Sequence, residues 1–270
     1  MNSVLLPTNA ASFAGLRIDR SKRTENGLFL ALFGSGGTGK TTILSDIVRS
    51  EHGTPTLLVD VEGGSSSVRH LVEYGLEIVH VTTWREIVAI RKELDRSHKY
   101  KSVLWDNLSE ITNLYKLQVA PNGIPEIQQW GRILAEMMEF VREQRRYTET
   151  QKLNVGMALW EEIAEDKTTE MVRTKVNLFR GFAAAFPGMV TQVGRVTVPL
   201  ERSEIRLLSF KPSERTDSKF RVAPDDKMNN IPRELYLRQD SYFLADLLAT
   251  MKDGVAFPIS RYEKPSKVVT

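Results

Sequence analysis

Residues 34–42 read GSGGTGKTT and contain the complete pattern GxxxxGK[ST]. In this pattern the glycines let backbone N–H groups converge on a phosphate, Lys40 neutralises the β- and γ-oxygens, and the Thr41 hydroxyl coordinates Mg²⁺. A glycine-rich turn that binds nothing is the alternative, but a chance match to the whole pattern has odds on the order of one per cent. We therefore expect a nucleotide site. Its residues would be Gly34, Ser35, Gly36, Gly37, Thr38, Gly39, Lys40, Thr41 and Thr42.

The sequence around this loop predicts an α/β fold. An apolar run at 28–33 precedes the loop and a helical pattern follows it, which indicates strand, loop and helix. Further buried strands are expected at 56–61, 77–82, 102–105 and 153–160, and the clearest amphipathic helix at 130–147. Such alternation is typical of a mostly parallel central sheet with helices on both faces. After about residue 185, β-like segments at 189–199, 204–211 and 219–222 predict an antiparallel β extension at the C-terminal side.

We divide the chain into an N-terminal arm (1–26), an ATPase core (27–222) and a small C-terminal extension (223–270). The extension is expected to hold a short helix at 242–251 and to end in a mobile tail at 257–270. With 270 residues, 41% hydrophobic and 26% charged, the chain can build a substantial core, which excludes global disorder.

Composition also narrows the chemistry. The chain has no cysteine, so disulfides, thiolate metal sites and cysteine nucleophiles are excluded. Its net charge is only +3, so any basic surface must be local. No apolar run approaches the roughly 18 residues of a membrane span, and no basic region precedes the short apolar stretch at the N-terminus. We expect a cytoplasmic protein without membrane contact.

Two carboxylates are candidates for the metal and for the attacking water. Asp106 follows the apolar strand 102–105, and ligands of open parallel sheets bind at that edge. The alternative is that Asp106 is the N-cap of the next helix. Glu62 is the first choice for orienting water, with Asp60 and Glu110 behind it. Asp60 and Glu62 would share one face of a regular strand, although a solvated strand end is also possible.

In their order along the chain, these motifs resemble those of the RecA-like ATPases. Within them the chain is most similar to the phage-encoded RecA-like proteins of the Sak single-strand-annealing group. The resemblance covers about residues 27–222. After the loop it is carried by LLVDVEGG (57–64), YKSVLWDNLSEI (100–111), WGRILAEMMEFVREQ (130–144), NVGMALWEE (154–162) and LLSFKPSERTDSKFRV (207–222). It implies a RecA-like P-loop NTPase fold, with ATP and Mg²⁺ as cofactors.

The resemblance also implies roles for individual residues. Lys40 and Glu62 would be catalytic, and Thr41 and Asp106 would hold the metal. Lys219 and Arg221 would match a Lys-x-Arg pair that reaches the γ-phosphate of the neighbouring subunit, since residues two apart on a strand share a face. An ordinary exposed basic strand is the alternative.

One position departs from the family pattern. Glu161 and Glu162 follow the strand where the family often has Gln or His. A carboxylate there would repel phosphate unless it binds metal or water.

RecA-like proteins bind single strands through two loops, which correspond here to 119–129 and 161–181. The second carries the candidate DNA-binding residues Lys167, Arg173, Lys175 and Arg180. Phe179 and Phe182 lie nearby in the sequence, and basic residues mixed with aromatics can follow a backbone and stack bases. Because the same stretch is rich in Glu and Asp, a solvated loop is the alternative.

The resemblance to the Sak group implies an ATP-hydrolysing phage recombination protein of the host cytoplasm. It would assemble as a homo-oligomer, ring or filament, on single-stranded DNA and promote annealing or strand pairing, with a single-stranded-DNA-binding protein as partner. A partition switch is one alternative, but Ser35 stands where that class has its signature Lys. A second alternative is a ring-shaped translocase or helicase-like motor. Such motors usually carry extra domains that grip DNA, and only about fifty residues follow the core here. A third alternative is an assembly protein that binds nucleotide without turnover.

Overall fold

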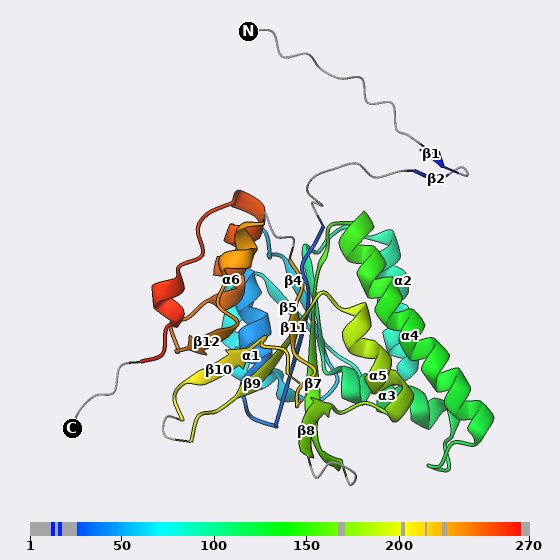
Figure 1. The fold of residues 1–270 in the computed structure, drawn as a ribbon. Coiled ribbons are helices and arrows are strands. Elements are labelled where there is room, and N and C mark those ends of the chain that lie inside the picture. Colours follow the sequence, from blue (N-terminus) through cyan, green and yellow to red (C-terminus); the bar gives the residue numbers. More distant parts are fainter. Residues whose placement is uncertain are drawn as a thin grey trace.

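The computed structural model describes residues 12–13, 16–17, 26–166, 171–200, 203–213, 215–222 and 226–265. A ten-stranded sheet runs through the core in the order β12-β10-β9-β3-β7-β6-β4-β5, with β8 paired to β7 and β11 to β9 (Figure 1). Its strands are β3 (Phe29–Gly34), β4 (Thr56–Asp60), β5 (Leu76–His80), β6 (Ser102–Asp106), β7 (Asn154–Asp166), β8 (Met171–Val176), β9 (Gln192–Thr197), β10 (Arg206–Ser209), β11 (Lys219–Phe220) and β12 (Glu234–Leu237). Separately, β1 (Ser12–Phe13) pairs with β2 (Leu16–Arg17).

The six strands from β9 to β5 pair in parallel, and β8, β10, β11 and β12 pair antiparallel. The predicted α/β class, mostly parallel with antiparallel C-terminal strands, is confirmed. One detail differs, because the segment at 189–199 was expected to be antiparallel but β9 runs parallel to β3. The reason is the helix α5 (Arg180–Met189), which carries the chain back along the sheet before β9 begins.

Helices cover both faces of the sheet (Figure 1). One face is covered by α2 (Trp84–Arg96), α3 (Leu108–Val119), α4 (Ile127–Thr150) and α5. The other is covered by α1 (Lys40–Ser45), η1 (Asp46–Arg49), η2 (Gly64–Tyr74) and α6 (Phe243–Leu248). β3 shows why both faces need cover. Phe29 and Phe33 belong to the first core cluster and Leu30 and Leu32 to the second, so the strand reads as one continuous apolar run.

The C-terminal segment is ordered further than its sequence indicates. After η3 (Lys227–Asn230) and β12, α6 continues into a π-helical turn (Ala249–Asp253), and η5 (Ile259–Tyr262) follows. The expectation of a mobile tail from residue 257 is wrong for its first half, because Phe257 and Tyr262 are buried and their rings stack with centroids 5.0 Å apart. The Tyr262 hydroxyl also donates to Asp246 at 2.6 Å. Residues 266–270 lie outside the described part of the chain.

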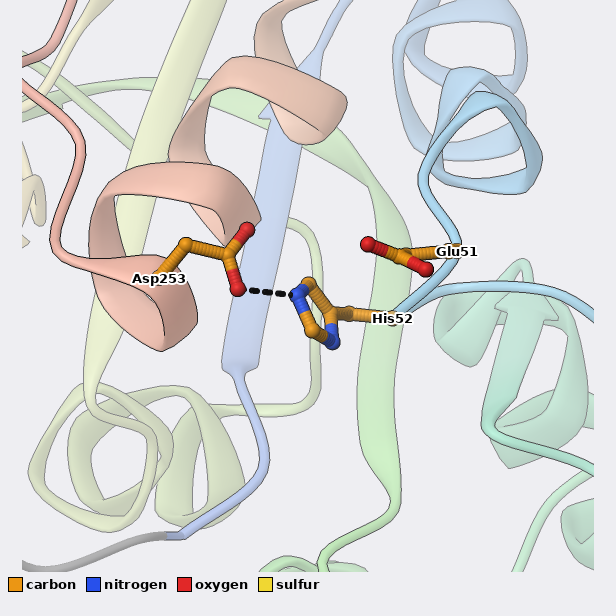
Figure 2. A group of neighbouring side chains, drawn as sticks. All are labelled: Glu51, His52 and Asp253. Atoms are coloured by element: carbon orange, nitrogen blue, oxygen red, sulfur yellow. Dashed lines mark hydrogen bonds and ion pairs between the residues drawn. The ribbon is translucent and has the colours of Figure 1, made fainter.

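A polar group joins the end of the π-helical turn to the core (Figure 2). His52 Nε2 and Asp253 Oδ1 lie 2.6 Å apart, and the Glu51 carboxylate is beside them, with one ligand-type atom of each residue within 4.8 Å of the others. The carbonyl of His52 accepts a hydrogen bond from Asn154, the first residue of β7. The group therefore lies at the amino-terminal edge of the parallel strands, opposite the phosphate loop.

Candidate nucleotide site

The GSGGTGKTT segment connects β3 to α1 at the carboxyl edge of the sheet. Gly37 and Gly39 have φ of 73° and 86°, a left-handed conformation that favours glycine. Gly34 is required for another reason, since a Cβ there would lie 2.3 Å from the carbonyl oxygen of Val196. These glycines thus meet the backbone geometry and close approach that a phosphate loop needs.

Lys40 is buried in the centre of this loop. Its Nζ donates to the carbonyls of Gly34 at 2.9 Å and Ser35 at 2.8 Å. Burial lowers the pKa of the ammonium, and the carboxylates of Glu62, Asp106 and Glu161 act in the opposite direction. The loop therefore holds a cation close to several acids, at the position where phosphate oxygens are bound in P-loop proteins.

The predicted metal-binding pair is brought together. The Thr41 hydroxyl donates to Asp106 Oδ2 at 2.6 Å, and Asp106 is 2% exposed. Burial, reinforced by Glu62 and Asp60, raises the pKa of Asp106 to about 6. A hydroxyl beside a buried carboxylate is a donor set that suits Mg²⁺, which binds through few protein oxygens and the phosphates of its substrate. These two residues would hold the ion.

Asp106 is not the cap of the following helix, so that alternative is wrong. The N-cap of α3 is the next residue, Asn107, whose side-chain oxygen accepts from the backbone N–H of Glu110 at 2.8 Å. Asn107 thereby leaves Asp106 free to face the loop.

Glu62 lies just beyond the end of β4, next to this pair. Its carboxylate accepts hydrogen bonds from the Asn107 side-chain amide and, at 3.1 Å, from the indole N–H of Trp160. Sequence reasoning missed both partners, because Asn107 follows β6, Trp160 belongs to β7, and the two meet Glu62 only in the folded sheet. The two donors fix the orientation of an exposed carboxylate.

Asp60 has a structural role instead. Because β4 ends at Asp60, the two acids do not continue one regular strand as expected. Its carboxylate accepts from the backbone N–H groups of Gly63 (2.7 Å), Gly64 (3.2 Å) and Ser65 (3.1 Å), and His80 Nδ1 lies 3.2 Å away. Burial alone would raise the pKa of Asp60, but these hydrogen bonds and His80 hold it below its usual value. The side chain organises the turn that presents Glu62.

The unexpected carboxylate, Glu161, is compensated by an arginine. One of its oxygens accepts from the Ser35 hydroxyl, and the other lies 3.1 Å from Nε of Arg195 on β9. The carboxylate of Glu161 therefore accepts a hydrogen bond from the phosphate loop and forms an ion pair with Arg195. Sequence reasoning missed Arg195, because its place beside the loop comes from the pairing of Arg195 with Phe33 in the folded sheet.

A second arginine lies on the other side of the loop. A Cβ at Gly39 would be 3.4 Å from Nε of Arg206, which comes from β10. The Arg206 guanidinium donates to the carbonyls of Ser203 and Ile205, and among the described residues no carboxylate pairs with it. Two cations from the C-terminal strands thus flank the loop.

Lys219 and Arg221 lie away from the loop. Lys219 pairs with Val193 of β9, and the Arg221 backbone N–H donates to Thr191, which places both beside the amino-terminal half of that strand. In the described part of the chain, no hydrogen bond or ion pair joins either residue to the loop, and Lys219 Nζ is buried without a hydrogen-bond partner. Burial, with Arg221 and Arg145 nearby, lowers the pKa of Lys219 to about 8.

The segment 161–181 was expected to be a loop. In the structure it contains the β7–β8 hairpin and the start of α5. Residues 161–166 pair antiparallel with 171–176, and this hairpin projects from the sheet (Figure 1). Of the DNA-binding candidates, Arg173, Lys175 and Arg180 line one cavity of about 710 Å³ together with Arg215. Glu165 and Asp217 also line it. Lys167 lies outside the described residues.

The segment 119–129 contributes no cation. It contains no Lys or Arg, and its large side chains Ile124 and Ile127 are 87% and 91% exposed. The basic residues gather on the hairpin side alone.

Comparison with known protein families matches residues 26–222 to the AAA domain. No curated protein matches the chain at a significant level. Within the described residues, no helix is both long and apolar enough to cross a bilayer. The matched segment covers most of the chain and includes the phosphate loop, Glu62, Asp106 and the hairpin. The chain belongs to the AAA domain family and is a P-loop NTPase.

Proposed function

We propose that this NTPase hydrolyses ATP and uses it in DNA recombination, assembling on single-stranded DNA and promoting annealing or strand pairing in the cytoplasm of a phage host. The observation that carries the ATPase part is the Thr41–Asp106 contact at 2.6 Å, directly beside Lys40 and Glu62. A metal-binding pair, a phosphate-binding cation and an oriented carboxylate are the parts that phosphoanhydride hydrolysis needs.

Each residue has a defined task in this proposal. Bound Mg²⁺ would neutralise charge on the phosphate oxygens. Lys40 binds phosphate oxygens, and Thr41 and Asp106 hold the ion. Glu62 orients the attacking water once its hydrogen bonds to Asn107 and Trp160 are rearranged. The water-orienting step needs a carboxylate within hydrogen-bond reach of the water, and a side chain at the strand end meets that need.

Arg195 and Arg206 flank the loop within one chain, and a cation from a neighbouring chain would add positive charge at the γ-phosphate from outside. Lys219 and Arg221 lie away from the loop, and among the described residues no ion pair joins either of them to an acid. Their position beside the amino-terminal half of β9 suits contact with a neighbouring chain. We therefore propose a homo-oligomer, ring or filament, in which each pair completes the next subunit's site.

DNA binding is supported by the cavity that Arg173, Lys175, Arg180 and Arg215 line beside the hairpin. Four cations that line one cavity can contact the phosphates of a single strand. The resemblance to the Sak group supports the same role, with a single-stranded-DNA-binding protein as partner.

Steady-state ATP hydrolysis with and without single-stranded DNA, at two salt concentrations, tests the proposal. Lys40→Ala serves as the blank. We expect DNA to stimulate hydrolysis and the stimulation to weaken with salt, because phosphate contacts release counterions. Hydrolysis that is indifferent to DNA would contradict the recombination role and favour a nucleotide-dependent switch or assembly factor.

A further inference from the structure

A smaller cavity lies beside Trp160, the residue that donates to Glu62. Its volume is about 240 Å³, below the roughly 300–1,000 Å³ of pockets that hold whole small-molecule ligands. Three aromatic side chains, Trp130, Trp160 and Phe179, line it together with Lys116. The remaining lining residues are Ser109, Thr112, Asn113, Asn177 and Leu178. We refer to it as the aromatic cavity.

The lining of the aromatic cavity suits a flat, polar ring. Trp130, Trp160 and Phe179 are each only partly buried, so their rings are accessible for stacking. Trp130 and Phe179 lie with centroids 5.5 Å apart at 41°, and Lys116 Nζ is 5.9 Å from the Trp130 centroid. Aromatic faces stack any base, and amide side chains can pair with its edge. A cavity of this size accommodates one ring system and leaves sugar and phosphate outside.

The aromatic cavity is continuous with the cations of the hairpin. Phe179 and Leu178 also line an adjoining cavity, which is lined as well by Lys175 and Arg180 and by the acids Glu162 and Asp217. Lys175 and Arg180 also line the cavity of about 710 Å³ described above, together with Arg173 and Arg215. A path from aromatic to basic residues matches a strand that presents bases and phosphates in succession. This charge complementarity favours a nucleic-acid strand over an apolar peptide.

We propose that the aromatic cavity binds one unpaired base of the single strand, and that Trp160 transmits its occupancy to Glu62. The inference rests on the proposed function, because it assumes that the chain binds single-stranded DNA. A duplex cannot supply this ligand without unstacking, since its bases are paired and stacked inside the helix.

The transmission follows from one hydrogen bond. The Trp160 ring lines the aromatic cavity, while its N–H donates to Glu62 Oε1 at 3.1 Å. A base stacked on Trp160 shifts the indole, and the Glu62 carboxylate then keeps only the Asn107 amide. The released oxygen becomes available to water. Trp160 is a positioning residue that acts on hydrolysis through Glu62.

Binding of a labelled oligothymidine and of an abasic strand of equal length, followed by fluorescence anisotropy, tests the base site. We expect the wild type to bind the base-bearing strand about 5- to 150-fold more tightly. Trp130→Ala and Phe179→Ala should remove that preference, and Leu117→Ala, on the exposed side of α3, should keep it. Because each variant is compared with itself on two strands, a general loss of stability leaves the ratio interpretable.

Equal binding of the two strands by the wild type would overturn the base site and leave the proposed DNA binding intact. Failure of the wild type to bind either strand would instead refute the DNA part of the proposed function, and the inference with it. A preference that survives both alanine substitutions would also overturn the inference, because the base would then bind elsewhere.

Trp160→Phe tests the transmission, since it keeps a ring and removes the N–H. We expect basal ATP hydrolysis to rise and the ratio of DNA-stimulated to basal rate to fall towards one. Damage to the fold would lower both rates. An unchanged ratio in this variant would refute the role of Trp160 while leaving the base site to be decided by the anisotropy experiment.

Discussion

The two ends of β9 carry cations in opposite electrostatic settings. At the carboxyl end, Arg195 pairs with Glu161, and Lys40 nearby is surrounded by three acids. Beside the amino half, Lys219 Nζ is buried with Arg221 and Arg145 as its charged neighbours and, among the described residues, no hydrogen-bond partner. The first region supplies its own countercharges. In the second region, the buried Lys219 ammonium lowers the free energy of unfolding of an isolated chain. An anion from another molecule beside Lys219 would offset this destabilisation.

The largest expected effect comes from removing the central cation of the first region. Lys40→Ala should weaken binding of a fluorescent ATP analogue by on the order of a hundredfold or more, because the charge-assisted interaction of the ammonium with the phosphates is lost. Titration of the analogue measures this. Lys92→Ala, an α2 lysine outside the site, is the matched control. Retained affinity would mean that the loop does not bind phosphate.

Glu62→Gln separates binding from turnover in the same region. The amide keeps the size of the side chain but cannot accept a proton, so we expect turnover to fall about 10²- to 10⁴-fold. Affinity for ATP should change little, since Glu62 contacts Asn107 and Trp160 rather than the loop. Single-turnover hydrolysis together with the binding titration distinguishes the two. Wild-type turnover would exclude Glu62 as the water-orienting residue.

Lys219→Met tests the second region through stability. The folded-state pKa of about 8 lies below the usual 10.5, so between these values the unfolded chain binds more protons and the free energy of unfolding rises with pH. At pH 7 the buried charge destabilises the chain. Replacement by Met should therefore stabilise it by on the order of 1 kcal/mol, a figure reduced because solvent screens a half-buried side chain.

Denaturant unfolding of Lys219→Met and wild type at pH 7 and pH 9.5 measures this effect. The difference between the two proteins should shrink at the higher pH. A destabilised variant at pH 7 would mean that Lys219 already has a stabilising partner within its own chain.

The smallest effect is expected at the amino-terminal edge, where His52 joins Asp253 (Figure 2). Because both side chains are partly exposed, His52→Ala should lower the free energy of unfolding by less than about 1 kcal/mol and leave hydrolysis unchanged. Thermal unfolding and the ATPase assay check the two parts. A large loss of activity would show that this edge communicates with the nucleotide site.

Local patterns predicted the parallel core and the phosphate loop well. The GSGGTGKTT segment largely determines its own conformation, since Gly37 and Gly39 have positive φ and Gly34 approaches the backbone of Val196 closely. The position of Asp106 could also be predicted, because an acid at the carboxyl end of a buried parallel strand lies at the edge of the sheet where ligands bind. Such features depend on a few consecutive residues, and a sequence displays them directly.

The partners that tune the site were not predictable in this way. Asn107 at the start of α3 and Trp160 on β7 meet Glu62 from distant parts of the sequence. Arg195 meets Glu161 only because β9 runs parallel beside β3. Likewise, Phe257 and Tyr262 looked like part of a polar tail, and their burial depends on α6 being placed beside them. These contacts follow from strand order and packing, which periodicity does not encode.

The most direct test of a site shared between chains is a mixing experiment. Lys40→Ala has a defective loop and an intact Lys219–Arg221 pair, and Lys219→Met/Arg221→Ala has the reverse. Each variant alone should hydrolyse ATP at background rate. An equal mixture should recover about a quarter of the wild-type rate, the share of interfaces at which an intact loop meets an intact pair in a head-to-tail assembly. A mixture as inactive as its components would contradict the account.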